Sequence, residues 1–440
     1  MTDLILVADA TGKQVLFSVP CSQSFEGSQL LIELSQLEIP QPVGFFDWIR
    51  YIDGTIDVLK GCFRIGAFIY PPGAVVFQCL VGAGSALQAG MKFVKNDTDP
   101  VDDKLKELSK TIHDVEKQLH ANFDDLKAFI TETEFTGDII GETSSLMRHL
   151  RSCLKRMDQR SRENFRAAYE KKTPLSLAYS MISLLELSST NPLVMSMAQE
   201  KAKTKATFKK WEDIILGVLG ELMTIEAFAS GLLKKENQYD FNRIMEKTQE
   251  VSEYIEKWRF EIGKDQGYWQ HLKEDLKGFL EKNSNLSLAE RADAIKGELE
   301  KYLTNDAFYI SVHYAWDHEN WGWMNTKAGE DQFIHLNGYG PHNLNTFVYR
   351  SKLANTVEIE KLEEMRIKVQ AFKTEAFKDK MPQALLDDPI PNAGFTILYG
   401  KLMEEIRSAN CPRREFGPGW WTYNFDFGGP DKRRLFVGYL

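Results

Sequence analysis

The stretch from residue 56 to residue 94 decides how this chain is organised: IDVLKGCFRIGAFIYPPGAVVFQCLVGAGSALQAGMKFV. It is the longest apolar segment of the sequence, and long charged helical patterns follow it. Pro71, Pro72 and Gly73 interrupt the segment. Because proline cannot continue a helix, we expect two helical arms joined by a tight turn. The sequence therefore predicts an apolar helical hairpin within residues 45–99.

Both arms combine an apolar surface with a narrow polar stripe. If both arms are helical, the polar residues of each arm fall on a single face of that arm. They are Asp57, Lys60 and Arg64 on the first arm, and Gln78, Ser85, Gln88 and Lys92 on the second. A stripe of this kind suits a helix that lines a water-filled channel while its other faces meet lipid. The arms, of about 15 and 22 residues, approach the length that crosses roughly 30 Å of hydrocarbon. The hairpin is therefore a candidate for membrane insertion.

The candidate insertion residues are the large apolar side chains of the two arms. They are Phe63, Ile65, Phe68, Ile69, Val75, Val76, Phe77, Leu80, Val81 and Leu87. On the second arm Gly82, Ala86 and Gly90 recur every four residues, which lets another helix approach closely. The alternative interpretation is a hairpin that stays buried in the helical core and has no membrane role.

Composition bounds the class of protein. The chain has 440 residues, of which 43% are hydrophobic and 27% charged, as in ordinary soluble proteins of two or three domains or one elongated domain. A formal net charge of -9 argues against nucleic acid as the main partner, because phosphate binding needs clustered Lys and Arg. Asp3 and Asp9 interrupt the apolar start, so a Sec signal is not expected. We expect a soluble protein, cytoplasmic or released without a Sec signal, that is membrane-associated when active.

The cysteines indicate a reducing compartment. They are five in number, widely spaced and without a C-x-x-C motif: Cys21, Cys62, Cys79, Cys153 and Cys411. Neither a disulfide framework nor a zinc site follows from this pattern. Cys62 and Cys79 fall at similar heights on the two arms, so they are either a possible pair or two small buried hydrophobes. We expect no cofactor.

The first 44 residues precede the hairpin as a separate segment. Two alternating runs, LILVADA and QVLFSVP, flank a turn around Gly12 and predict a β-hairpin over residues 4–19. A lone hairpin is not stable, so we expect it to join the strand-rich material beyond residue 306. Residues 28–39 predict a short helix that ends before Pro40.

Residues 100–305 predict a bundle of long helices. Apolar residues spaced by three and four indicate helices over residues 101–135, 142–172, 174–190, 191–233, 241–279 and 287–303. The pattern over 241–279 alone is equivalent to roughly 60 Å of helix. Helices of this length indicate an elongated, coiled-coil-like bundle. The fold class expected is thus mainly α.

Residues 306–440 have a different character. Short β-rich runs lie among Gly, Pro and Asn turns, with one charged helix over residues 355–380, and predict a small β-rich domain. The region is unusually aromatic, and Trp316, Trp321, Trp323, Trp420 and Trp421 are candidates for recognition. Exposed rings would suit a sugar face or the membrane interface, whereas buried rings would be core.

Four histidines, His313, His318, His335 and His342, lie within thirty residues of one another beside several acidic residues. A metal site could be assembled if the strands brought them together, and a metal-dependent enzyme is therefore a third and weaker function class. Their spacing matches no established ligand pattern. We predict no metal site, no catalytic residue and no enzymatic activity.

An apolar hairpin followed by several very long helices resembles the α-helical pore-forming toxins of the cytolysin A type. The order of parts, ending in an aromatic strand-rich region, also resembles the rapunzel-like proteins and the jellyfish cytolysins. The resemblance concerns the layout of residues 45–305 and transfers no functional residue. It implies a protein that inserts its hairpin into a membrane and forms a homo-oligomer there, with the C-terminal region recognising a membrane lipid or a glycan receptor. The competing class is a non-enzymatic coiled-coil scaffold.

Overall fold

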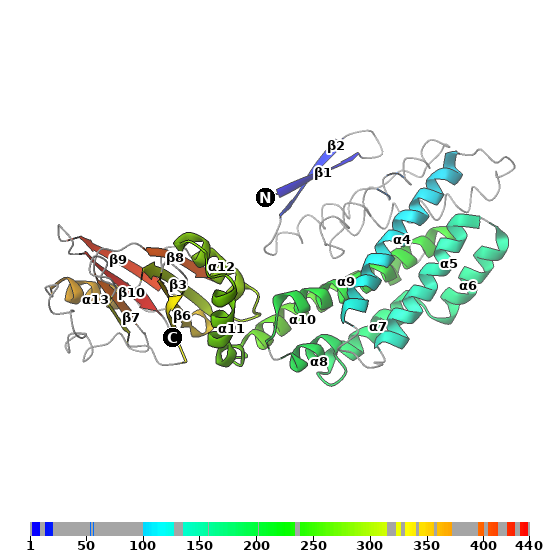
Figure 1. Cartoon of the computed structure of the whole chain (residues 1–440). Helices are drawn as coiled ribbons and strands as arrows, with labels where there is room; N and C mark the ends of the chain where they lie inside the picture. The colour runs from blue at the N-terminus through cyan, green and yellow to red at the C-terminus, as the bar shows by residue number, and fades with distance from the viewer. Residues whose placement is uncertain are drawn as a thin grey trace. The chain divides into compact units, whose positions relative to one another are not determined.

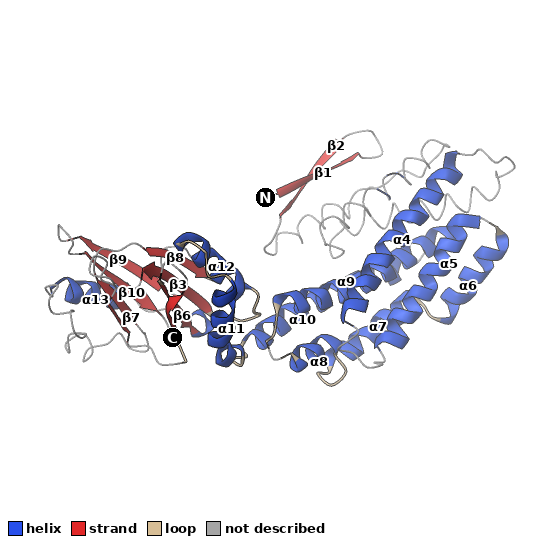
Figure 2. Ribbon diagram, in the orientation of Figure 1, coloured by secondary structure: helices blue, strands red, loops and turns tan. Residues whose placement is uncertain are grey.

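The chain is mainly helical, with antiparallel sheets in its C-terminal part, as predicted (Figures 1 and 2). The computed structural model describes residues 2–8, 14–20, 53, 56, 100–126, 135–156, 158–200, 202–233, 238–314, 323–326, 331–339, 343–355, 359–371, 395–399, 404–411, 420–426 and 432–438. The chain divides into two compact units, which are described separately. The first comprises residues 1–199 and 209–256, and the second comprises residues 200–208 and 257–440.

Helices build the first unit. They are α4 (Pro100–Leu126), the π-helix η2 (Phe135–Gly141), α5 (Glu142–Arg156), α6 (Gln159–Lys171), α7 (Pro174–Glu186), α8 (Pro192–Gln199), α9 (Lys205–Leu232) and α10 (Gln238–Gly263). The central element is α9, which from Trp211 onward is apolar on nearly all sides and almost entirely buried. Among the described helices it is the one long and apolar enough to cross a membrane, and its apolar part is wholly enclosed.

Several helix ends follow local signals in the sequence. The hydroxyl of Thr173 accepts a hydrogen bond from the Ser176 N–H, and Pro174 occupies the first turn, so α7 begins where predicted. The predicted helix over residues 142–172 is two helices, however. The Asp158 carboxylate accepts a hydrogen bond from the Ser161 N–H at 2.6 Å and caps a new helix, α6, after α5 has ended.

Two further long helices are also interrupted. The prediction over residues 191–233 was wrong, because the chain between α8 and α9 pairs with another segment. The Lys205 N–H donates to the Lys301 carbonyl and the Leu303 N–H to the Lys203 carbonyl, both at 2.8 Å. These bonds replace helical ones, and Thr204 forms an isolated β-bridge with Tyr302.

The predicted helix over residues 241–279 is α10 followed by α11 (Tyr268–Lys282). A Cβ atom at Gly263 would lie 2.5 Å from the Asn305 Oδ1, so the chain approaches too closely there for any larger residue. The Asp265 carboxylate then accepts a hydrogen bond from the Gly267 N–H at 2.7 Å and fixes the turn.

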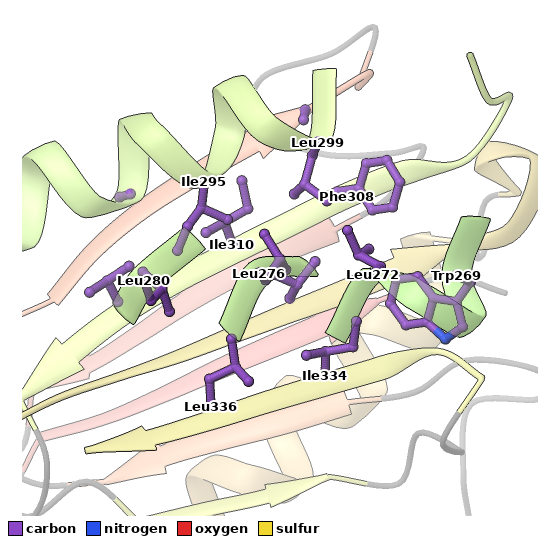
Figure 3. Packing of buried hydrophobic residues seen from close by; sticks show 14 of the residues in the cluster. Trp269, Leu272, Leu276, Leu280, Ile295, Leu299, Phe308, Ile310, Ile334 and Leu336 are labelled. Carbon is purple, nitrogen blue, oxygen red and sulfur yellow. The ribbon is translucent and has the colours of Figure 1, made fainter. Parts of the chain in front are cut away.

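The second unit is built around a four-stranded antiparallel sheet in the order β5-β6-β3-β8. Its strands are β3 (Ala307–Tyr314), β5 (Phe333–Tyr339), β6 (Leu344–Ser351) and β8 (Glu404–Ala409). Helices α11 and α12 (Leu288–Glu300) cover one face of the sheet. Figure 3 shows how leucines of α11, such as Leu272 and Leu276, meet Ile310 and Ile334 of the strands. The helices that the sequence grouped with the long bundle thus pack on this sheet.

A second antiparallel sheet has the order β4-β7-β10-β9. It contains β4 (Trp323–Thr326), β7 (Phe395–Tyr399), β9 (Trp420–Asp426) and β10 (Lys432–Gly438). Strand β10 contacts β6 of the first sheet, and α13 (Ile359–Ala371) contacts β9 and β10. At the N-terminus, β1 (Thr2–Ala8) and β2 (Gln14–Pro20) form the predicted hairpin. Among the described strands they pair only with each other, so the expectation that they join the C-terminal sheet was wrong.

Candidate functional site: the junction of α4, α5 and α9

Helix α4 connects the predicted hairpin to the bundle, and its packing follows the predicted apolar seam. Leu105, Leu108, Ile112 and Val115 are all buried. Two residues at the start of the hairpin segment, Asp53 and Ile56, are also described. The Asp53 carboxylate lies 2.7 Å from the Lys104 ammonium of α4, and Ile56 is only 2% exposed. The start of the hairpin segment is therefore linked to α4 by a partly exposed ion pair, and Ile56 close to it in the chain is buried.

Polar side chains meet where α4 contacts α5 and α9. Glu116 of α4 is 2% exposed, and its Oε2 lies 2.7 Å from the Arg151 Nε of α5. Glu221 of α9 is 3% exposed, and the charges of Glu116 and Arg151 both act on it. We call Glu116, Arg151 and Glu221 the junction triad. It places two carboxylates against one guanidinium inside a mainly apolar bundle.

Burial dominates the acid–base properties of the junction triad. Burial and the neighbouring Glu116 carboxylate together raise the pKa of Glu221 to about 8, against the opposing effect of Arg151. Burial also raises the pKa of Glu116, although Arg151 and Arg148 act against this shift. The triad therefore holds one proton near neutral pH, and that proton makes it neutral as a whole.

A second buried acid of α9 accepts a hydrogen bond from another helix. The Tyr169 hydroxyl of α6 donates a hydrogen bond to the Glu226 Oε1 at 2.7 Å, and both residues are buried. Together with Glu221 this bond shows that the apolar α9 carries polar groups that its neighbours must satisfy. None of these residues was predicted from the sequence, since the only signal was that Glu221 and Glu226 interrupt the apolar run of α9.

A side chain of α4 approaches the backbone of α9 closely at one glycine. A Cβ atom built on Gly217 would lie 2.7 Å from the Leu119 Cδ1 of α4. Because that atom is the end of a flexible side chain, a methyl group can be accommodated by a small shift, whereas a larger side chain would have to displace α4. Gly217 and Leu119 thus mark the point of closest contact between the two helices.

We predict that Gly217→Leu lowers the free energy of unfolding by about 1 to 3 kcal/mol, as overpacking of a core usually does. Gly217→Ala should be nearly neutral, because the better helix propensity of alanine offsets the small shift of Leu119. Urea denaturation followed by circular dichroism measures both variants. Gly278→Ala is the control, since nothing lies within 4 Å of a Cβ atom at that position. Equal effects of Gly217→Leu and Gly217→Ala would contradict the close approach.

Most residues that the sequence singled out for insertion lie outside the described residues. This holds for the turn (Pro71, Pro72 and Gly73), for the close-packing residues (Gly82, Ala86 and Gly90), and for Phe63, Ile65, Phe68, Ile69, Val75, Val76, Phe77, Leu80, Val81 and Leu87. Cys62 and Cys79 lie outside as well. What the structure adds is the position of the base of the segment, at Asp53 and Ile56.

The candidate recognition residues are placed in part. Trp323 lies in β4, and Trp420 and Trp421 lie in β9, so three of the five belong to the outer strands of one sheet. Trp316 and Trp321 lie outside the described residues. The sheet therefore keeps Trp420 and Trp421 together on one edge strand and places Trp323 on the opposite edge strand.

Two of the four histidines are described, and both lie in the β5-β6-β3-β8 sheet. His313 and His335 point to the face opposite α11 and α12, where their rings neighbour Phe347 and Phe333 respectively. Burial lowers the pKa of both, that of His335 to about 4, which favours neutral rings. Within the described ranges no three or more His, Cys, Asp or Glu residues are grouped so that they could hold a metal ion.

A groove of about 500 Å³ runs along α7 in the first unit. It is lined by three serines of α7, by leucines, and at its ends by Asp138 and Lys172. The Ser176 and Ser180 hydroxyls donate to backbone carbonyls, so mainly their oxygen lone pairs are left for other partners. The Lys172 ammonium pairs with Glu142. The groove can accept hydrogen-bond donors but presents no reactive group.

Comparison with known proteins supplies a family. No curated protein and no solved structure matches this chain significantly. A family model described as "Protein of unknown function (DUF684)" matches residues 103–432, which is well over half of the chain. The matched range includes the whole junction triad and begins after the predicted hairpin. The chain therefore belongs to the DUF684 family.

Proposed function

We propose that the protein inserts its residue 56–94 hairpin into a membrane and forms a pore there as a homo-oligomer, in the manner of a cytolysin. The bundle of the first unit stores the hairpin until it is released, and the long helices act as an elongated coiled coil in the assembled form. The C-terminal region recognises a membrane lipid or a glycan. The proposal includes no enzymatic step.

One observation carries this proposal: the start of the hairpin segment is linked to α4 by the Asp53–Lys104 ion pair, and Ile56 near it in the chain is buried. Because α4 follows the segment directly in the chain, we expect the two to move together. An apolar segment of this length is expected to need cover in water. The base of the segment is held on α4, and α4 is held in turn on the bundle at the junction triad. Opening of this junction would release the stored segment.

The scaffold remains the second candidate, and α9 favours it. A helix whose apolar part is wholly enclosed, and whose Glu226 accepts a buried hydrogen bond, is also what the permanent core of a soluble protein requires. In that case α4 never leaves the bundle, and the apolar segment is core throughout. The two functions differ in one measurable outcome, which is the permeability of a bilayer exposed to the protein.

We predict that the wild-type protein releases dye from liposomes and that Gly82→Ile or Gly90→Ile strongly slows release, since a branched side chain blocks close approach of two helices. Release is followed by fluorescence dequenching, and circular dichroism checks that each variant is folded. Gly278→Ala in α11 serves as the control, because its substitution meets no neighbouring atom. Complete absence of release by the wild-type protein, across lipid compositions and pH values, would favour the scaffold.

A further inference from the structure

We propose that the junction triad is a proton-controlled latch: Glu221 in its neutral form holds α4 on the bundle, and loss of its proton releases α4. The latch regulates the proposed insertion and rests on that function for its biological meaning. As a property of the first unit, it can be tested without a membrane. Its parts come from three helices that are far apart in the sequence, α4, α5 and α9 (Figure 1).

The latch contains two carboxylates and one guanidinium, so its charges do not balance when both carboxylates are ionised. Arg151 is engaged with Glu116 at 2.7 Å, so its single positive charge already faces one carboxylate. Within the described part of the chain, the Glu221 Oε1 is buried and has no hydrogen-bond partner. If Glu221 ionises, the junction contains two negative charges and one positive charge away from water. Such a buried excess charge is strongly unfavourable.

The other charges near the triad belong to Glu116 and not to Glu221. His113 of α4 lies 3.9 Å from Glu116 and accepts a hydrogen bond from Arg151 at 2.8 Å. Arg148 of α5 acts on Glu116 as well. Among the described residues, two charges act on Glu221. The Glu116 carboxylate repels its ionised form, and Arg151, which also pairs with Glu116, attracts it. Ionised Glu221 therefore repels Glu116 electrostatically, and Glu116 is the residue that α4 contributes to the triad.

The direction of the pH effect follows from proton binding. The pKa of Glu221 is about 8 in the folded protein and near its ordinary value of 4.5 when the junction is open. Between these two values the closed state holds a proton that the open state has lost. Opening therefore becomes easier as the pH rises, by up to about tenfold per pH unit, and the effect levels off above pH 8. Acidification strengthens the latch, and mild alkalinity opens it.

The test is hydrogen exchange of the α4 backbone amides around Leu105 to Val115 in the full-length protein, measured by mass spectrometry between pH 5.5 and pH 9. Glu221→Gln keeps the shape of the neutral side chain and cannot ionise. The ratio of wild-type to variant exchange rates removes the pH dependence of the exchange chemistry itself. We expect this ratio to rise by about tenfold or more from pH 5.5 to pH 8 and then to level off. A ratio that stays constant over this range would overturn the latch.

Two further variants make the result decisive. Glu253→Gln removes an exposed acid of α10 in the same unit, and its ratio should stay flat. Glu116→Gln removes the carboxylate that repels Glu221 and leaves Arg151 free to pair with it, so the rise should shrink and level off at a lower pH; an unchanged rise would contradict the shared charge. Dye release is scored separately. A rising exchange ratio without release at any pH supports the latch and refutes insertion, whereas release with a flat ratio supports insertion and refutes the latch.

Discussion

Replacing Asp306 by alanine is expected to lower the free energy of unfolding of the second unit by about 3 to 5 kcal/mol, the usual cost of removing one partner from a buried ion pair. Asp306 is fully buried and lies 3.5 Å from the Arg350 guanidinium. It also accepts hydrogen bonds from the Tyr268 hydroxyl at 2.6 Å and from the Leu353 N–H at 2.9 Å. The Gln266 Nε2 donates to it as well, at 3.3 Å, so its loss removes the acceptor that these four partners share.

Arg350 explains why the loss is so large. Its guanidinium stacks over the Trp269 ring, 4.4 Å from the ring centre, and donates to the Gln266 Oε1 at 2.5 Å. The network thus ties β3 and β6 to the turn before α11. Removing Asp306 leaves a charge in this enclosed place that the remaining neutral partners cannot balance.

The measurement is urea denaturation monitored by tryptophan fluorescence, compared with a matched acid. Asp331→Ala removes a carboxylate whose partner is the exposed Lys352, and a surface pair of this kind contributes no more than about 1 kcal/mol. Asp306→Asn should lie between the two, because it keeps hydrogen-bonding capacity without the charge. An Asp306→Ala variant as stable as Asp331→Ala would show that the buried network is not what holds β3 to α11.

Much of the secondary structure could be predicted from the sequence. Spacing by three and four identified α4, α7, α12 and α13, and alternation identified β1, β2 and most C-terminal strands. Strand β8 was missed because its sequence, EEIRSA, carries charges on the side that meets α12. There Arg407 pairs with Asp293 at 2.6 Å. Its strand character comes from pairing with β3 and not from its own composition.

The helix interruptions show where periodicity fails as a guide. Ile262 and Trp269 are seven residues apart, so the apolar spacing continues unbroken across the turn between α10 and α11. The glycines and Asp265 within this turn were the better signal. Between α8 and α9 the cause is tertiary: the chain exchanges backbone hydrogen bonds with residues 301–303, which no local pattern reveals.

The candidate site was harder to predict than the fold. Glu221 stands among apolar residues of α9, but Glu116 lies 105 positions away beside Asp114 and Lys117, and nothing in the spacing indicates that the two face the same arginine. An isolated acid inside an apolar helix is nevertheless a useful signal, because burial forces it to find a partner or a proton. In this chain the signal singles out Glu221, whereas its partners become evident only from the packing of α4 and α5 on α9.

Insertion as proposed requires α4 to leave the bundle together with the hairpin, and a reversible covalent lock between α4 and α9 tests this directly. The Leu119 Cγ lies 3.7 Å from a Cβ atom built on Gly217, so a Leu119→Cys, Gly217→Cys double variant places two thiols within reach of a disulfide after a small adjustment. In the oxidised protein α4 cannot separate from α9. The single Leu119→Cys variant, treated identically, is the control for oxidation of the native cysteines.

We predict that the oxidised double variant releases no dye from liposomes, that a thiol reductant restores release to the level of the single variant, and that the single variant is unaffected by oxidant. The measurement is the rate of dye release before and after reduction, with the fraction of protein carrying the disulfide determined by mass spectrometry. Release by the fully oxidised double variant at the rate of the reduced protein would contradict the proposed insertion, because α4 would then have stayed on α9 while the membrane was breached.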